Sequence, residues 1–119
     1  MLQLSAQRSA DMVVLRCTGR IVAGEAVVAL HRTATAQRAA GLVIDLRGVE
    51  ILDAAGLGTL LRIRQWCDSQ GMKLKLVNLN KHVREVLAVT ALDSVLLVHP
   101  TENDSDLQAL RHEWACAEI

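Results

Sequence analysis

The sequence predicts an α/β domain whose sheet is mostly parallel, with one antiparallel strand at its N-terminal edge. Two strand-like segments open the chain, at residues 2–7 and 12–18, and the short polar turn between them favours an antiparallel hairpin. Apolar strand-like runs then alternate with segments of helical period up to about residue 98. Because a strand–helix–strand unit crosses over right-handed and joins parallel strands, the later strands are expected to lie parallel in one sheet.

The first half of the chain supplies the hairpin and the first helix. The strand at residues 12–18 is rich in branched apolar residues and ends at Gly19. A helical pattern begins near Gly24, and we expect Gly41 to end that helix as a C-terminal cap. The apolar face of this helix consists of Val27, Leu30 and Ala34.

The second half of the chain repeats strand and helix. Residues 42–46 form a short apolar run that fits a strand buried on both faces, and a helical pattern over residues 59–70 ends before Gly71. Lysine alternates with apolar residues over 72–77, which indicates a further strand. The remaining expected elements are a helix capped by Asn80 with Val83, Val86, Leu87 and Thr90 inward, a strand at residues 95–98 stopped by Pro100, and a closing helix at about residues 104–117 with Leu107, Leu110 and Trp114 on its apolar stripe.

The amino-acid composition argues against several classes of protein. The 119 residues are enough for one domain with an ordinary core, and a hydrophobic fraction of 51% argues against disorder. The 13 basic and 13 acidic residues cancel, and the chain has two Trp and no Phe or Tyr, so neither nucleic acid nor an anionic membrane is an expected partner. No apolar run reaches the roughly 18 residues of a spanning helix, and the N-terminus has no signal-peptide layout. Three widely spaced cysteines, Cys17, Cys67 and Cys116, predict reduced thiols in a cytoplasmic protein.

Residues 51–58, with the sequence Ile-Leu-Asp-Ala-Ala-Gly-Leu-Gly, join the central strand to the second helix. Asp53 is placed to cap that helix, since its carboxylate can accept hydrogen bonds from the free N–H groups of the first turn. Ala54, Ala55 and Gly56 are small, so another backbone or a partner's surface can approach closely. A helix N-terminus at the end of a parallel strand is also where anions and docking partners usually bind. The alternative interpretation is a well-capped turn with no further role.

The residue types that carry catalysis or metal binding show no such arrangement in the sequence. Asp45 lies in an apolar strand, and nearby backbone groups or an arginine such as Arg47 are expected to satisfy it. No nucleophile–base pair is visible, and the histidines are not paired with Cys or carboxylates at ligand spacing. These histidines are His31, His82, His99 and His112. The sequence therefore predicts no enzyme, no metal site and no cofactor.

Three short motifs, together with the order of elements, carry a family resemblance. They are Thr18-Gly19 after the second strand, Asp53-x-x-Gly56-Leu57-Gly58 at the central turn, and Val83-Arg84-Glu85-Val86-Leu87 in the third helix. In this combination they resemble the STAS domain, the family of sulfate-transporter tails and anti-sigma-factor antagonists. The resemblance covers residues 2–98 and implies a single STAS domain over residues 1–119. It further implies that the helices lie mainly on one side of the sheet.

The resemblance also implies a role without chemistry of its own. In stand-alone STAS proteins the surface around the central turn binds a serine-kinase anti-sigma factor and so frees the sigma factor; the kinase reverses this by phosphorylating a Ser or Thr in the turn. Leu57 is the expected apolar contact unless it belongs to the core. A bulky charged residue at Gly56 or Leu57 is expected to abolish binding while leaving the fold intact, and loss of folding would instead assign these residues to the core. The implied partner-binding residues are Asp53, Ala54, Ala55, Gly56, Leu57, Gly58 and Leu61.

The sequence departs from the family pattern at the turn. The family usually has Asp-Ser-Ser-Gly-Leu-Gly with the second Ser as phosphoacceptor, whereas this chain has Ala54 and Ala55. An alanine methyl has no oxygen to receive a phosphoryl group, so Ala55 is the phosphoacceptor-equivalent position without the switch. Thr59 is the nearest hydroxyl, about one helical turn further on. The loop after the second strand also differs, because Gly19-Arg20-Ile21-Val22 stands where antagonists commonly have Gly-Glu-Leu-Asp.

Two functions fit these observations. The favoured hypothesis is a cytoplasmic, anti-sigma-factor antagonist-like module that binds a serine-kinase anti-sigma factor or a similar partner through residues 53–61, without the usual Ser phosphorylation switch. The alternative is a STAS subunit of a lipid-type ABC transporter, where a permease and an ATPase are the partners, or of a stress-signalling scaffold. Such components can work without a phosphorylated Ser. Neither hypothesis requires nucleic acid or membrane insertion, and a homodimer is compatible with both.

Overall fold

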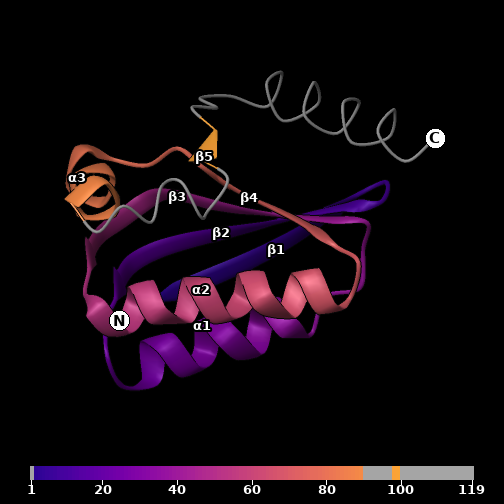
Figure 1. The fold of residues 1–119 in the computed structure, drawn as a ribbon, viewed down its shortest axis with the longest axis horizontal. Coiled ribbons are helices and arrows are strands. Elements are labelled where there is room, and N and C mark those ends of the chain that lie inside the picture. The colour runs from indigo at the N-terminus through magenta and orange to yellow at the C-terminus, as the bar shows by residue number, and fades with distance from the viewer. Residues whose placement is uncertain (1, 90–97, 100–119) are drawn as a thin grey trace.

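The computed structural model describes residues 2–89 and 98–99 of the chain. Strands and helices alternate within this part (Figure 1). The elements are β1 (Gln3–Ser9), β2 (Met12–Ile21), α1 (Glu25–Thr35), β3 (Gly41–Leu52), α2 (Ala54–Ser69), β4 (Lys73–Val77), α3 (Lys81–Val89) and β5 (Val98–His99). The sheet order is β1-β2-β3-β4-β5, with β1 antiparallel to β2 and every later neighbouring pair parallel. The predicted fold class, with its antiparallel edge strand, is therefore confirmed.

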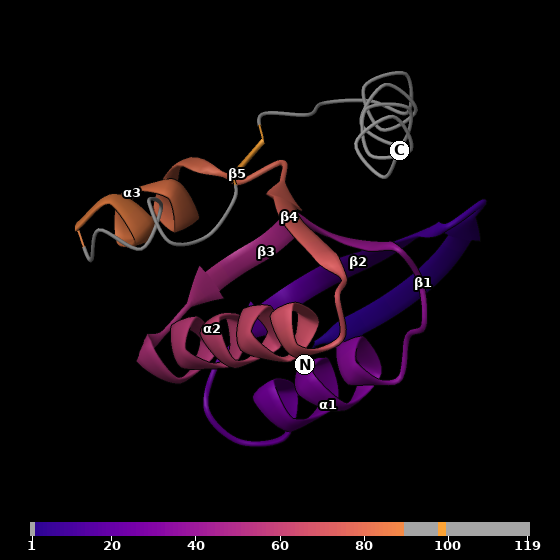
Figure 2. The same ribbon diagram turned by 45° about the vertical axis from the view of Figure 1, so that its right-hand side comes forward.

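Two of the helices cover one face of the sheet. α1 and α2 lie side by side across it, and both begin at the end of the sheet where β2 and β3 finish (Figure 1, Figure 2). α3 packs against β3. Because side chains alternate between the faces of a strand, residues two apart share a face. The main core cluster accordingly takes Leu15 and Cys17 from β2 and Leu42 and Ile44 from β3. A smaller cluster on alternate positions consists of Met12, Val14, Val43 and Val77.

Local sequence signals explain where the helices begin and end. Gly24 precedes α1 with a φ of 108°, a backbone conformation that residues with a Cβ rarely adopt. Gly71, with a φ of 70°, follows the end of α2 as predicted. Asn80 caps α3, because its Oδ1 accepts a hydrogen bond of 2.9 Å from the N–H of Val83. The buried face of α2 follows helical spacing through Leu57, Leu60, Ile63 and Cys67.

Gly41 has a different role from the one the sequence suggests. α1 ends at Thr35, and Gly41 is the first residue of β3, so the prediction that Gly41 caps this helix is wrong. The N–H groups of Ala40 and Gly41 donate hydrogen bonds of 2.8 and 3.3 Å to the carbonyl of Asp11. These bonds fix the start of β3 beside the turn between β1 and β2. The glycine therefore marks the beginning of a strand rather than the end of a helix.

β3 is much longer than the apolar run that predicts it. It continues to Leu52, because its second half still pairs with the end of β2 despite two irregularities in register. Gly48 permits this pairing, since a Cβ there would lie only 2.9 Å from the Oγ1 of Thr18. Exposed residues such as Glu50 interrupt the apolar pattern and hide the continuation. β3 thus ends one residue before Asp53, which lies directly at the start of α2.

The two described cysteines are free thiols inside the core, as predicted for Cys17. Burial raises the pKa of Cys17 to about 12, and the negative charge of Asp45 adds to the effect. Burial likewise raises the pKa of Cys67 to about 11, with a further contribution from Asp68. Since the thiolate is the reactive form of cysteine, both side chains are inert near neutral pH in the folded chain.

Several predictions fall outside the described residues. They concern most of the strand at residues 95–98, the closing helix at residues 104–117, and the side chains of Thr90, His112 and Cys116. The domain span of residues 1–119 also stays a prediction. Across residues 2–89 and 98–99, no helix is long and apolar enough to cross a membrane. In the same part of the chain, no group of three or more His, Cys, Asp or Glu residues is placed to hold a metal ion.

Candidate functional site

Asp53 joins three segments at the end of β3. Its Oδ1 accepts a hydrogen bond of 2.8 Å from the N–H of Gly56, and its Oδ2 accepts one of 3.0 Å from the N–H of Ala23. Its own N–H donates to the carbonyl of Ile21 over 3.3 Å. The hydrogen bond from Ala23, followed by that from Gly56, lowers the pKa of the Asp53 carboxyl below its ordinary value. The predicted N-cap is confirmed, and the same side chain also holds the β2–α1 loop against the start of α2.

We expect Asp53→Asn to lower the thermal midpoint at neutral pH, because an amide oxygen can replace one accepted bond but its NH₂ group cannot accept the other. The folded-state pKa of Asp53 is lowered from 3.8. Its stabilisation is therefore full above that unfolded value and is lost as the pH falls through the lower folded-state value. Thermal denaturation of both proteins across this acidic range should show their midpoints converging. Asp68→Asn, at an exposed carboxylate in the last turn of α2, is the control. A gap that stays constant with pH would contradict the capping role.

Two of the predicted partner contacts belong to the core instead. A Cβ built on Gly56 would lie 2.4 Å from the carbonyl oxygen of Ile21 and 2.6 Å from Cδ1 of Leu52. Leu57 is only 7% exposed and is part of the main core cluster. This burial favours the core role that the sequence left open for Leu57, and we now expect a bulky charged residue at either position to disturb the fold. Both residues lie where α2 packs against the sheet.

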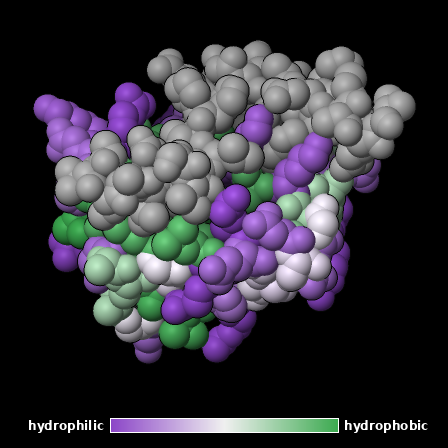
Figure 3. Space-filling model, viewed as in Figure 1, coloured by the Kyte–Doolittle hydropathy of each residue, from purple (hydrophilic) through white to green (hydrophobic). Residues whose placement is uncertain are grey.

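The remaining predicted residues form a continuous surface, which we call the α2 outer face: Ala54, Ala55, Gly58 and Leu61. Ala54 is exposed and the other three residues are half-buried. Their spacing of three to four places them on one side of the helix. A Cβ on Gly58 would meet no atom within 4 Å, so its surface is open. Figure 3 shows pale and green residues, with hydrophilic residues between them, over the N-terminal ends of α1 and α2.

The hydroxyl that lies nearest along α2 is inaccessible. Thr59 is fully buried, and its Oγ1 donates a hydrogen bond of 2.8 Å to the carbonyl of Ala55. The same oxygen accepts a hydrogen bond of 3.1 Å from Nη2 of Arg62. A kinase would have to unwind the first turns of α2 to reach it. Thr59 is therefore a poor substitute for a phosphoacceptor at position 55.

The segment that begins at Gly19 lies beside this surface, but its residues 19–21 are the end of β2 rather than the loop that the sequence suggests, because they pair with β3. The Arg20 side chain is exposed and its Nε lies 4.0 Å from Oε2 of Glu50 on β3. Ile51, the cross-strand partner of Arg20, is 39% exposed, which is unusual for a large apolar residue. Glu50 and Ile51 are exposed residues near the turn that the sequence did not single out. No alternation marks them, because Glu50 is followed by two apolar residues, of which the first is exposed and the second is buried.

Asp45 is a structural carboxylate rather than a catalytic one. It is 7% exposed, and its Oδ1 accepts hydrogen bonds from the backbone N–H of Arg47 at 2.9 Å and from Nδ2 of Asn78 at 3.1 Å. Its Oδ2 lies 3.7 Å from Nε of Arg16. Backbone and arginine groups thus satisfy it, as predicted, but the guanidinium near Oδ2 belongs to Arg16. The carboxylate ties β3 to β2 and to the connection that follows β4.

Comparison with known sequences identifies a family. The family model of the STAS domain matches residues 3–105 of this chain. A STAS-domain containing protein of Pseudomonas aeruginosa (strain UCBPP-PA14) is 30% identical over 56 residues. These residues are 47% of this chain and 55% of that relative, so the match spans about half of each protein.

Solved structures share the fold over nearly the whole chain. An anti-sigma factor antagonist from Mycobacterium paratuberculosis has a TM-score of 0.79 at 25% identity, covering 93% of this chain and 95% of that one. The anti-sigma factor antagonist SpoIIAA, in its unphosphorylated form, has a TM-score of 0.77 at 16% identity, covering 94% of this chain and 97% of that one. The second likeness concerns the fold alone. With the family model matching most of its residues, this chain belongs to the STAS domain family.

Proposed function

We propose that this protein is an anti-sigma-factor antagonist-like interaction module that binds a serine-kinase anti-sigma factor, or a similar protein, through the α2 outer face. One observation carries the proposal. The first two turns of α2 present a small, uncharged surface at the carboxyl end of β3, and Asp53 holds it rigidly to the β2–α1 loop. The similarity to an anti-sigma factor antagonist supports the choice of partner. The module acts in the cytoplasm and has no catalytic step of its own.

Binding would rely on close approach rather than on charge. Ala54 and Gly58 let a partner's backbone come near the helix, and Leu61 adds a half-buried apolar contact. Asp53 contributes by positioning the turn, since its carboxylate oxygens already accept bonds from the chain's own N–H groups. Gly56 and Leu57 lie on the core side of α2 and hold the helix against the sheet. A rigid surface loses little conformational entropy when it binds, which favours affinity.

The absence of a switch follows from the same surface. A phosphate would add a charge of about −1.5 to −2 beside Asp53 and disrupt a packed contact. Neither Ala54 nor Ala55 has an oxygen to carry it, and Thr59 is fully buried. We therefore propose that this antagonist is not released by phosphorylation at the turn. Incubation with its kinase partner and ATP should give no phosphopeptide from residues 53–61, and a phosphorylated Thr59 would overturn this part of the proposal.

Capture of the partner tests the function. Tagged wild-type protein should recover a serine-kinase anti-sigma factor from its own cells, as identified by mass spectrometry. Gly58→Arg should lose this partner and keep the wild-type circular dichroism spectrum, because the new side chain enters open space. Gln65→Arg places the same charged side chain at an exposed position further along α2 and should retain the partner. Equal capture by wild type and Gly58→Arg would remove the α2 outer face from the proposal.

The alternative is a STAS subunit of a lipid-type ABC transporter or of a stress-signalling scaffold. The observation that favours it is again the turn, since such a subunit needs no phosphoacceptor at Ala55. The same capture experiment separates the two functions. Recovery of a permease and its ATPase, lost in Gly58→Arg, would assign the α2 outer face to a transporter.

A further inference from the structure

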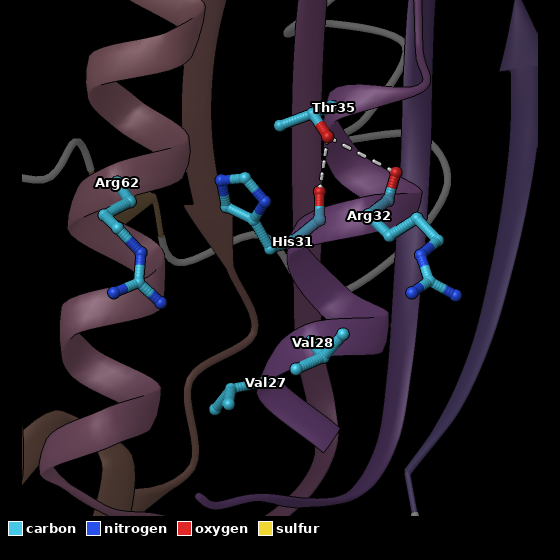
Figure 4. Close-up of a pocket in the computed structure, with 6 residues that line it drawn as sticks. All are labelled: Val27, Val28, His31, Arg32, Thr35 and Arg62. Carbon is cyan, nitrogen blue, oxygen red and sulfur yellow. Dashed lines mark hydrogen bonds between the residues drawn. The ribbon is translucent and has the colours of Figure 1, made fainter. Parts of the chain in front are cut away.

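A surface hollow lies between α1 and α2, next to the α2 outer face. It has a volume of about 510 Å³ and is lined by Val27, Val28, His31, Arg32, Thr35 and Arg62. Figure 4 shows the side chains of Val27, His31 and Arg62 in the space between the two helices. A second hollow of about 750 Å³ shares Val27, Val28 and Arg32 and reaches the start of α1, where Gly24 and the acidic residue Glu25 also line it. Val28 lines both hollows and is 52% exposed, which makes it the most exposed large apolar residue that the structure describes.

The charges around these hollows are mainly positive. α1 and α2 together carry three arginines (Arg32, Arg62 and Arg64) and two acidic residues (Glu25 and Asp68). Within residues 2–89, the guanidinium of Arg62 donates a hydrogen bond to Thr59, but neither this group nor the guanidinium of Arg32 has a carboxylate partner. Two such groups beside an exposed apolar side chain form a surface that favours an acidic, amphipathic ligand.

We propose that the α1–α2 hollow binds an acidic amphipathic segment of the protein partner, with an apolar side chain on Val28 and carboxylates against Arg32 and Arg62. This inference rests on the proposed function and names the chemistry of the partner. Arg62 lies one helical turn beyond Gly58, so the hollow continues the α2 outer face. A partner that covers Ala54 and Gly58 therefore reaches the hollow without crossing other elements. The acidic segment adds specificity to a contact that is otherwise small and uncharged.

The geometry favours a protein segment over a small anion. The hollow is wide and open, and its arginine side chains lie at the surface, where attraction to a free anion is weak and screened by salt. Val27 and Val28 line the same space and offer nothing to a phosphate. An amphipathic segment can contact the apolar and the charged groups at once, because its apolar face covers the valines while its carboxylates pair with the guanidinium groups.

The binding of two synthetic peptides to the full-length protein tests the inference. Both are amphipathic helices with leucine on one face; one has glutamate on its flanks and the other has lysine. Fluorescence anisotropy should show binding of the glutamate peptide, weakening as salt is added, and little binding of the lysine peptide. Arg62→Glu and Arg32→Glu should each lower the affinity for the glutamate peptide about tenfold, since attraction between opposite charges is replaced by repulsion between like charges. Arg64→Glu, the same change at a residue that lines neither hollow, should bind as wild type does.

The outcomes separate this inference from the proposed function. If Gly58→Arg loses the cellular partner while Arg62→Glu and Arg32→Glu keep it and the peptides do not bind, the acidic segment is wrong and the α2 outer face stands. Equal binding of both peptides, or equal loss in Arg64→Glu, would also overturn the inference. ATP and vesicles of phosphatidylglycerol serve as further probes. Binding of either one in competition with the glutamate peptide would indicate a general anion surface and count against a specific protein segment.

Discussion

Gly56→Ala should destabilise the fold by about 3 kcal/mol, whereas Gly58→Ala should stabilise it by about 1 kcal/mol. The two glycines are two residues apart in the same helix, and the substitutions are chemically identical. At Gly56 the added methyl would lie 2.4 Å from the carbonyl oxygen of Ile21, which is backbone and cannot rotate away. At Gly58 it would meet no atom within 4 Å and only improves helix propensity.

Urea denaturation followed by circular dichroism measures both changes. The expected result is a midpoint below wild type for Gly56→Ala and above it for Gly58→Ala, with similar slopes. The comparison is internally controlled, because any general effect of alanine in the first turns of α2 applies to both variants. A wild-type midpoint for Gly56→Ala would mean that α2 does not pack closely against the end of β2. Such a result would contradict the assignment of Gly56 to the core.

Leu57→Glu should destabilise the protein by more than about 4 kcal/mol or prevent folding. Leu57 is 7% exposed within the main core cluster, so glutamate there would place a charge in an apolar environment. Leu61→Glu is the matched control one turn later on the same helix. Leu61 is half-buried and packs against the edge of the core cluster, so its variant should lose about 1–2 kcal/mol, far less than Leu57→Glu, and should lose the partner while still folded.

These two leucines separate folding from binding. Denaturation midpoints and partner capture, measured together, should place Leu57→Glu among the folding defects and Leu61→Glu among the binding defects. If Leu57→Glu folds normally and loses only the partner, the helix presents a different side to solvent from the one described. If Leu61→Glu keeps the partner, the contact surface ends before Leu61 and lies closer to Ala54.

The capping network explains why the turn is a suitable place for a binding surface. Asp53 accepts hydrogen bonds from Ala23 and from Gly56, so its carboxylate links the β2–α1 loop to the first turn of α2. A surface held in this way needs no ordering step when a partner arrives. The buried glycine behind it sets how close the helix lies to the sheet. Residues that never touch a partner thus determine the shape that the partner meets.

Sequence alone determined the order of the elements, the antiparallel edge strand, the caps at Asp53 and Asn80, and the family resemblance. These features depend on periodicity, turn residues and short motifs, which act over a few neighbouring positions. The absence of a hydroxyl at Ala55 is likewise a property of the sequence. No packing arrangement can add a phosphoacceptor to that position.

Tertiary structure decided which of the motif residues are available to a partner. Asp53-x-x-Gly56-Leu57-Gly58 is continuous in sequence, yet Gly56 and Leu57 face the core and Gly58 faces solvent. The reason is a contact with Ile21, thirty-five positions earlier, and no local pattern records a neighbour at that separation. The same holds for the length of β3, which depends on pairing with β2, and for the α1–α2 hollow, which exists only where two helices meet.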